Sequence, residues 1–579
     1  MTRRRWLLSA LLAILAAAVI GWTRLAPRST VTPSPTPRTA TGEPSRGGSL
    51  VATLRTEPKT FNRYTSSGFP THLIAALTQA RLVRINSATF ELEPWLAERW
   101  TVSDDARTYT LDLRQGVRFS DGAPFTAADV LFSFAAAYDP KTAGAIGESL
   151  RVKGKPLQVR AISPSSVALT FPEPYGPGLR MLDNLPIYPQ HRLARALKDG
   201  SFATAWGPQT PPGEMAGLGP FVLTKYEPGQ RLAFARNPHY WRRDRAGRRL
   251  PFLDRLTLEI VPDQNAELLR MQAGGLDVMQ GEMRPEDYLP LKREADAGRL
   301  RVLDVGASLG HHLLWFNLGT SRPASGWLRA PEFRRALSVA VDRDAFTRTV
   351  YLGAATPSWG IVSPANRTWF SEAVERPPYD PDRARTLLAG IGLTDRGNTG
   401  GLQDASGKPV QFTLLVQKGI AASEKGASFL REAFTRVGVR MDVVALDPAA
   451  VMASWGRGDY DAIYHHMDFT DTDPAGSLDF WQSSGAMHLW HPGQRTPATE
   501  WEGRIDALMT RQASAVDPAE RHRMFADVQR TLAEQVPALS FATPHVFVST
   551  STRVTGGRTA VLRPQVLWDA DEITVSAVP

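Results

Sequence analysis

Short apolar runs and amphipathic segments alternate along most of the chain. Residues 50–54 form an apolar run of strand length, and residues 109–113 alternate apolar and polar side chains, as a half-buried strand does. Thr126 follows, and Asp129 stands three residues later at the start of a helical pattern, an arrangement typical of a helix N-terminus. The first third of the chain therefore predicts strands and helices in mixed order.

From residue 300 onward the same alternation continues with clearer helices. Residues 331–351 show the strongest helical periodicity, and Pro331 suits the first turn of that helix. Further helices are predicted at 381–388, 424–437, 501–509 and 518–535. Strands are predicted at 301–305, 312–318, 411–416 and 440–444. Strands that alternate with helices in this way are typical of an α/β fold.

The N-terminus has the layout of an export signal. Arg3, Arg4 and Arg5 precede an uncharged apolar run that ends at residue 22. That run is also at the short end for a membrane span, so residues 1–22 fit a cleaved signal peptide or an uncleaved anchor. Residues 23–45, rich in proline and threonine, are predicted to be an extended linker. We expect an exported protein at the periplasmic or extracellular face of the cytoplasmic membrane.

Composition narrows the function classes. A chain of 579 residues is long enough for two or three domains. Six arginines and one glutamate among the first 45 residues supply five of the nine net positive charges, so the body is only weakly basic. The densest basic cluster of the body, at 242–249, is predicted to decorate a solvated loop, and nucleic acid is not expected as a partner. The absence of cysteine excludes disulfides and thiolate chemistry.

Three motifs suggest catalysis or metal binding but lack the required context. Ser308, within 306–310, stands in a hydrolase nucleophile pattern, yet a strand is predicted to follow it where a helix is needed. Residues 471–476 resemble half of a calcium loop without its closing glutamate. The histidine pairs 311–312 and 465–466 point to opposite strand faces, which hinders chelation by one pair. We therefore expect no enzymatic activity and no cofactor.

A series of motifs in fixed order carries a family resemblance. The motifs lie at 94–100, 113–130, 217–221, 236–241, 275–278, 316–317, 334–343, 459–461 and 473–474. Together they resemble the family of extracellular solute-binding proteins that serve peptide and nickel ABC importers. The resemblance extends from residue 47 to about residue 557, which is essentially the whole body.

The resemblance implies an α/β, bilobed periplasmic-binding-protein fold with an extra subdomain and a central ligand cleft. Lobe I would be discontinuous, the extra subdomain would be inserted into it, and the chain would cross twice to lobe II. The implied boundaries are 46–82, 200–312 and 541–579 for lobe I, 83–199 for the extra subdomain and 313–540 for lobe II. A ligand that contacts both lobes would favour the closed state. Capture of this kind is binding alone, so no covalent bond needs to be broken.

Ligand-binding candidates cluster around the motif at 473–474. In peptide-binding relatives an aspartate shortly before this motif receives the α-ammonium of the ligand. Here Asp468 and Asp471 flank the expected position, which Thr470 occupies, and Met467 replaces the tryptophan usual upstream. The two aspartates either read a positive group on the ligand or cap turns.

Other candidates rest on residue type and position. Trp359 and Trp481 would either line a pocket or belong to the core. Tyr64, Gln280 and Glu282 are cleft candidates because each follows a predicted strand.

The resemblance also implies partners. The chain would capture a peptide or a similar small solute and deliver it, as a monomer, to an ABC permease and ATPase complex. A sugar, an opine or a metal chelate is the alternative ligand. A secreted hydrolase or an anchored ligand sensor is the alternative from another class.

Overall fold

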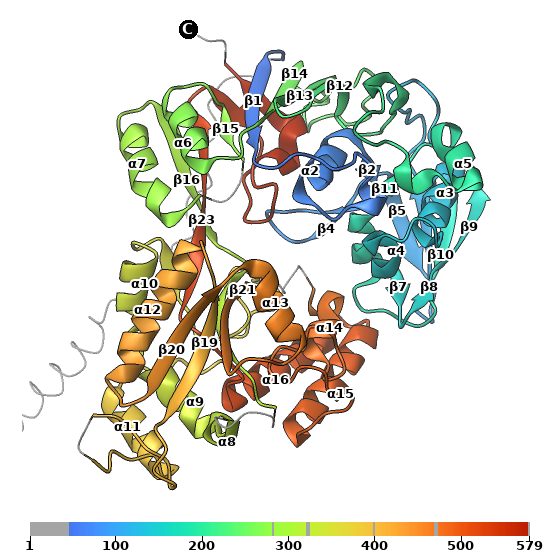
Figure 1. Cartoon of the computed structure of the whole chain (residues 1–579). Coiled ribbons are helices and arrows are strands. Elements are labelled where there is room, and N and C mark those ends of the chain that lie inside the picture. The colour runs from blue at the N-terminus through green and yellow to red at the C-terminus, as the bar shows by residue number, and fades with distance from the viewer. Residues whose placement is uncertain (1–45, 281–282, 320–324, 398–399, 468–472, 577–579) are drawn as a thin grey trace, which may run out of the picture. The chain divides into compact units, whose positions relative to one another are not determined.

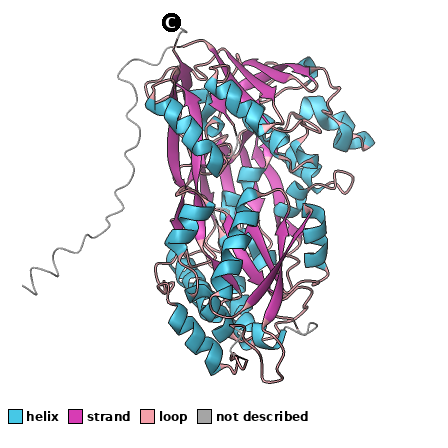
Figure 2. Cartoon of the chain, turned by 60° about the vertical axis from the view of Figure 1, so that its left-hand side comes forward, coloured by secondary structure: helices cyan, strands magenta, loops and turns pink. Residues whose placement is uncertain are grey.

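The computed structural model describes residues 46–280, 283–319, 325–397, 400–467 and 473–576. Three sheets hold most of the strands in this part of the chain. Residues 1–45 lie outside the described residues. Helices pack over the strands of the sheets (Figure 2). In the described residues no helix combines the length and the apolarity needed to cross a membrane.

The largest sheet collects strands from distant parts of the sequence. In spatial order its strands are β12 (Phe221–Glu227), β13 (Arg231–Arg236), β14 (Arg255–Ile260), β1 (Ser49–Leu54), β15 (Val278–Met279), β23 (Ala542–Ser551) and β16 (Leu300–Ala307), and β18 (Ala355–Pro357) pairs with β23. The apolar run predicted at 50–54 is β1, which runs parallel to β14 and buries Leu50, Ala52 and Leu54. This sheet therefore joins a strand from the start of the body, β1, with a strand from near its end, β23.

A second sheet comes from one continuous stretch of sequence. It is antiparallel, and its strands are β5 (Ala97–Val102), β6 (Thr108–Leu113), β10 (Ser166–Thr170) and β9 (Gln158–Ser163). Helix α3 (Ala127–Tyr138) packs on it and begins at the N-cap predicted from the sequence. The Thr126 hydroxyl and the Asp129 carboxylate satisfy each other's backbone N–H groups as a capping box.

The third sheet lies between residues 311 and 540. Its strands, in spatial order, are β20 (Arg440–Leu446), β19 (Gln411–Gln417), β21 (Ala462–Met467), β17 (His311–Phe316) and β22 (Ala538–Ser540). All six residues of β17 are buried because the strand lies between two neighbours inside the sheet. Helix α12 (Ala421–Thr435) packs against β19, β20 and β21.

The remaining helices cover these sheets, and short ribbons complete the fold. Apart from α9 and α10, which are described below, these α-helices are α2 (Phe69–Thr78), α4 (Ala145–Ser149), α5 (Gln190–Asp199), α6 (Gln264–Gln272), α7 (Pro285–Asp296), α8 (Ser325–Leu328), α11 (Pro381–Gly390), α13 (Pro448–Gly456), α14 (Leu478–Trp481), α15 (Glu500–Ser514) and α16 (Pro518–Gln535). The ribbons pair β2 (Ala80–Arg81) with β11 (Pro186–Ile187), β3 (Val83–Ile85) with β4 (Leu92–Pro94), β7 (Arg151–Val152) with β8 (Lys155–Pro156), and β24 (Val554–Gly556) with β25 (Ile573–Val575).

The chain passes between the first and third sheets at two neighbouring places. β16 leads into β17 through residues 308–310, and β22 leads into β23 through Phe541. β16 pairs with β23, so the two passages lie side by side (Figure 1). A strand, β17, follows Ser308 where the hydrolase motif needs a helix, as the sequence predicted.

One predicted helix is wrong in its extent. The segment 331–351 is two helices, α9 (Pro331–Val339) and α10 (Arg343–Val350). The break occurs because the Asp342 carboxylate accepts the backbone N–H of Ala345 at 2.9 Å and so starts a new helix. The apolar periodicity continues across the break, which is why the pattern predicts a single helix.

Candidate functional site

A large cavity among the described residues has a volume of about 1000 Å³. Its walls come from segments that are remote in sequence. They include η1 (Arg63–Thr65), α2, β2 and β3 near the N-terminus, η2 (Gly178–Asn184), the start of α14, the end of α15, and η6 (Leu567–Glu572). A volume of this size is at the upper end of the range for small-molecule sites.

The charged side chains of the cavity are distributed unevenly. Residues before 200 and after 560 supply all of the lining cations, namely Arg63, Arg81, Arg84, Arg151, Lys153, Arg180 and Arg563. The same segments supply four acids, namely Glu148, Glu173, Asp183 and Asp571. The lining residues between 473 and 514 include the acids Asp473 and Asp479 and no cation. The first wall is therefore net positive, whereas the opposite wall presents two acids, of which Asp473 is neutralised by Arg521.

Arginines and tryptophans stack on one another beside the positive wall. The Arg84 guanidinium lies 3.9 Å from the ring centre of Trp95, whose other neighbour is Arg242 at 4.4 Å. Arg84 also approaches Trp568, at 5.0 Å, and Arg558 approaches the same ring at 4.6 Å. Cations that stack on indole rings are held in place while their edges stay available for hydrogen bonds.

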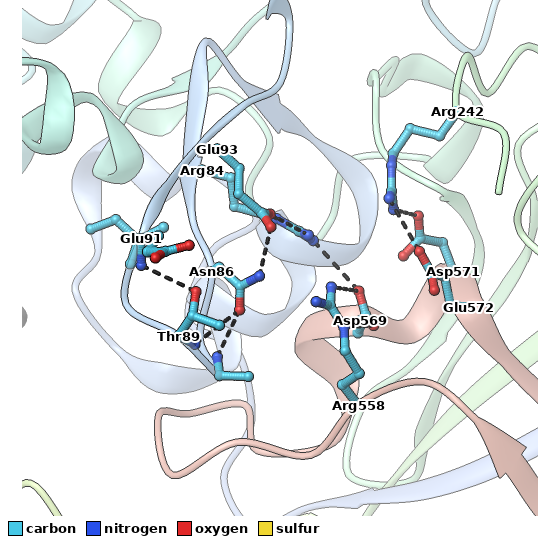
Figure 3. Close-up of polar contacts among 12 residues, drawn as sticks. Arg84, Asn86, Thr89, Glu91, Glu93, Arg242, Arg558, Asp569, Asp571 and Glu572 are labelled. Atoms are coloured by element: carbon cyan, nitrogen blue, oxygen red, sulfur yellow. Dashed lines mark hydrogen bonds and ion pairs between the residues drawn. The ribbon is translucent and has the colours of Figure 1, made fainter. Parts of the chain in front are cut away.

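Carboxylates neutralise these stacked arginines. Arg84 pairs with Glu93 at 2.9 Å, and Arg242 pairs with Asp571 and with Glu572, the latter at 3.2 Å (Figure 3). Burial raises the pKa of Glu572, and the negative charges of Asp569 and Asp571 add to that effect. The cluster holds the segment 558–572 against the rest of the wall. Arg242 is thus largely buried, which corrects the prediction that the whole basic cluster at 242–249 is solvated.

Arg63 lies in a narrow recess of the same cavity. Arg63, His72, Gln79, Arg81 and Asn184 line both the recess and the cavity. Arg63 is only 8% exposed, and its guanidinium donates to the Ser66 carbonyl at 2.7 Å and to the Asn184 amide oxygen at 2.8 Å. Burial lowers the pKa of Arg63, and the positive charge of Arg81 lowers it further. Both hydrogen-bond acceptors of this buried cation, the Ser66 carbonyl and the Asn184 amide oxygen, are neutral groups.

The neighbours of Arg63 do not neutralise it. Arg81 pairs with Asp183 at 2.8 Å, and the same carboxylate oxygen accepts the backbone N–H of Ile85. Burial lowers the pKa of His72 to about 3, and the charges of Arg81 and Arg63 contribute, so His72 is neutral at pH 7. The recess thus holds two guanidiniums and one carboxylate, and that carboxylate is paired with Arg81.

The opposite wall is closed by a buried ion pair. The Asp473 carboxylate receives two hydrogen bonds from the Arg521 guanidinium, at 2.7 and 2.9 Å, and caps a short 3₁₀ helix, η5 (Pro474–Ser477). The backbone N–H of Gly176 donates to the Ala513 carbonyl at 2.7 Å. Gly176 has no room for a Cβ, because that atom would collide with the Arg521 guanidinium and the Ala515 carbonyl.

Those site residues predicted from the sequence that the structure describes do not line this cavity. Tyr64 is buried beside Tyr188 and Phe202 and donates its hydroxyl to the Pro186 carbonyl at 2.8 Å. Trp481 is fully buried and donates its indole N–H to the Pro474 carbonyl at 3.1 Å. Neither side chain lines the large cavity.

The other described candidates also lie elsewhere. Trp359 borders a smaller cavity of about 80 Å³ and donates to the Pro377 carbonyl at 3.1 Å. Met467 is buried at the end of β21, opposite His311. Gln280 is buried after β15, with its side-chain N–H₂ 3.5 Å from the Gln565 side-chain oxygen. Glu282, Asp468, Thr470 and Asp471 lie outside the described residues, and a role of any of these candidates in contacting a solute stays a prediction.

The histidine pairs occupy neighbouring strands. His312 is buried opposite His466, and its ring nitrogens face the Tyr351 and Ser423 hydroxyls at 3.2 and 3.0 Å. Across the described ranges no group of three or more His, Cys, Asp or Glu side chains is placed to hold a metal ion.

Sequence reasoning missed Arg63, His72 and Arg81. Arg63 follows Asn62, whose side chain accepts the backbone N–H of Tyr64 and so sets the short helix η1. No periodicity or spacing marks these three residues, because arginine after a strand is most often solvated. Only the packing of η1, α2 and β2 against each other places them in one recess.

Comparison with known proteins adds independent findings. Residues 91–488 match the model of the family described as Bacterial extracellular solute-binding proteins, family 5 Middle. A Deinococcus radiodurans protein described as "Probable ABC transporter-binding protein" is 26% identical over 556 residues, which cover 91% of each chain.

Solved structures share the fold. The oligopeptide-binding protein AppA of Bacillus subtilis, in complex with a nonapeptide, has a TM-score of 0.68 at 22% identity and matches 92% of this chain and 100% of its own. NikZ of Campylobacter jejuni, in complex with Ni(L-His), has a TM-score of 0.71 at 21% identity and matches 91% of this chain and 99% of its own. The α/β periplasmic-binding-protein fold expected from the sequence is confirmed.

Proposed function

Because this chain belongs to the bacterial extracellular solute-binding proteins of family 5, we propose that it captures a peptide or a similar small solute for an ABC importer. The chain is an extracytoplasmic binding protein of an ABC transporter and not an enzyme. The ligand class is the part that we propose.

The observation that carries the proposal is the cavity of about 1000 Å³ and the origin of its walls. Arg63 and Asp183 come from the N-terminal third of the chain, and Asp473 and Thr510 come from the segment after 313. A solute that fills this space contacts both segments at once. The net positive wall and the Asp479 carboxylate on the opposite wall suit a solute that carries both signs, as a peptide with free termini does.

We propose the division into lobes and subdomain that the family resemblance implies. Lobe I comprises 46–82, 200–312 and 541–579, the extra subdomain 83–199, and lobe II 313–540. The two side-by-side passages at 308–310 and at Phe541 support a hinge there, since few backbone torsions would have to change.

We further propose where the protein works and with what. Residues 1–22 direct export and either are removed or anchor the chain, and residues 23–45 act as a spacer. The loaded monomer delivers its solute to an ABC permease and ATPase complex. A neighbouring permease gene would support import over ligand sensing.

Native mass spectrometry of protein purified from its own host tests the ligand class. We expect the folded protein to carry one or more peptides, released on denaturation and identified by sequencing. Small-angle scattering should then show compaction when the released peptide is added back to the emptied protein. A released sugar or metal chelate would replace the peptide in this proposal, and the absence of any compacting solute would contradict capture between lobes.

A further inference from the structure

The recess around Arg63 has a positive charge that the described residues do not compensate. Among the cavity cations, Arg84 pairs with Glu93, Arg151 with Glu148, and Lys153 with Glu173. The side-chain acceptors of Arg63 are instead a backbone carbonyl and an amide oxygen. Burying a guanidinium without a carboxylate partner costs free energy, so an anion that pairs with it should bind strongly.

The recess itself has a volume of about 10 Å³, which is room for about one water, so an anionic group would bind at its mouth, where the recess opens into the large cavity. Arg63 comes from η1, His72 from α2, Arg81 from β2 and Asn184 from the end of η2, and all four also line the large cavity. A group held there would thus be one end of a solute lying in the cavity. A planar guanidinium fork presents parallel N–H donors that match the two oxygens of a carboxylate.

The net charge of the recess is positive at neutral pH. Arg63 and Arg81 carry two positive charges, Asp183 carries one negative charge, and His72 is neutral. Asp183 is already engaged by Arg81 and by the backbone N–H of Ile85. An incoming carboxylate would therefore balance the recess.

We propose that Arg63, assisted by Arg81 and by the neutral His72, forms a subsite that binds a carboxylate of the captured solute. This subsite rests on the proposed function, because it assigns one end of the solute in the same cavity. It makes the positive wall the place where the solute is oriented.

The decisive experiment uses a probe that is simpler than any transported solute. Binding of succinate and of its neutral analogue succinamide to the emptied full-length protein is measured by calorimetry at constant ionic strength. We expect succinate to bind and succinamide to bind at least about tenfold more weakly. Arg63→Gln should weaken succinate binding by about tenfold or more.

A matched control separates the subsite from general charge effects. Arg301 also donates to two backbone carbonyls, those of Thr552 and Val554, but does not line the cavity. Arg301→Gln should leave succinate binding unchanged. Equal weakening in both variants, equal binding of succinate and succinamide, or no succinate binding to the unmodified protein would each overturn the subsite.

A second variant acts in the opposite direction and keeps the test valid if Arg63→Gln does not fold. Asp183→Asn removes the carboxylate of the recess and should tighten succinate binding several-fold, since the net positive charge rises by one. Unchanged or weaker binding in a folded Asp183→Asn protein would contradict the subsite.

Trialanine and trialanine amide distinguish failure of the subsite from failure of the proposed function. Succinate binding that depends on Arg63, without binding of either peptide, would refute the peptide ligand and retain the subsite. Equal binding of both peptides would retain the peptide ligand and refute the subsite.

Discussion

Arg63 and Arg521 are buried arginines on opposite sides of one cavity, and they differ in what surrounds their charge. Arg521 meets the Asp473 carboxylate through two hydrogen bonds, whereas the acceptors of Arg63 within the described residues are neutral oxygens. Arg343 provides a reference away from the cavity, because it is buried and makes five hydrogen bonds to neutral oxygens. A cation that the chain satisfies fully has a structural role, and a cation left short of acceptors in a cavity wall is available to a solute.

Breaking the Asp473–Arg521 pair should have the largest effect. Asp473→Asn leaves a buried guanidinium without its carboxylate, so the free energy of unfolding should fall by about 3–5 kcal/mol. Urea unfolding measures the change. The exposed pair of Asp382 and Arg385 is the control, and Arg385→Gln should be nearly neutral. A stability loss no larger than that of the control would remove the contrast between the two walls.

The next largest effect concerns two carboxylates outside the described residues. If Asp468 or Asp471 receives a ligand ammonium, Asp→Asn at that position should cost about 2–5 kcal/mol of binding free energy. If both only cap turns, the loss should appear as about 1 kcal/mol of stability instead. Calorimetry and thermal melts on the two variants separate these outcomes. Unchanged affinity in both would favour a ligand without a positive group.

A smaller effect is expected where the chain closes over Arg521. Gly176→Ala places a Cβ against the Arg521 guanidinium and the Ala515 carbonyl, so we expect about 1–3 kcal/mol of destabilisation. Chemical unfolding measures it. Gly213 has open space around its Cβ position and an ordinary backbone conformation, so Gly213→Ala should not destabilise the protein. Similar stability of the two variants would show that the atoms around Gly176 move to accept a Cβ at little cost in free energy.

The smallest effect is a pH dependence that comes from His72. Its folded-state pKa of about 3 lies below the ordinary value of 6.5, so the unfolded chain takes up a proton first as the pH falls. The contribution of His72 to stability should therefore decrease from pH 7 towards pH 3. Relative to His72→Gln, the unmodified protein should lose about 1–2 kcal/mol of stability between pH 7 and pH 5. Parallel stability curves for the two proteins would contradict a neutral His72 beside Arg63.

Local sequence determined the elements of this protein and the family to which it belongs. The capping box of Thr126 and Asp129, the helix α16 at Pro518–Gln535 and the buried strand β17 all follow from patterns that extend over a few residues. Such a pattern fails where a capping side chain interrupts an apolar period, as Asp342 does between α9 and α10. The ordered motifs likewise identify the family, because they preserve turns and caps along the whole body.

Only the tertiary structure decided which charged residues face the cavity and which are already paired. Arg242 and Arg63 look alike in the sequence, yet Asp571 and Glu572 neutralise the first from more than 300 residues away, and no such partner reaches the second within the described residues. Ion pairing depends on distances between elements remote in sequence, and burial depends on how those elements pack. A sequence pattern contains neither quantity, which is why the recess around Arg63 could be recognised only in the folded chain.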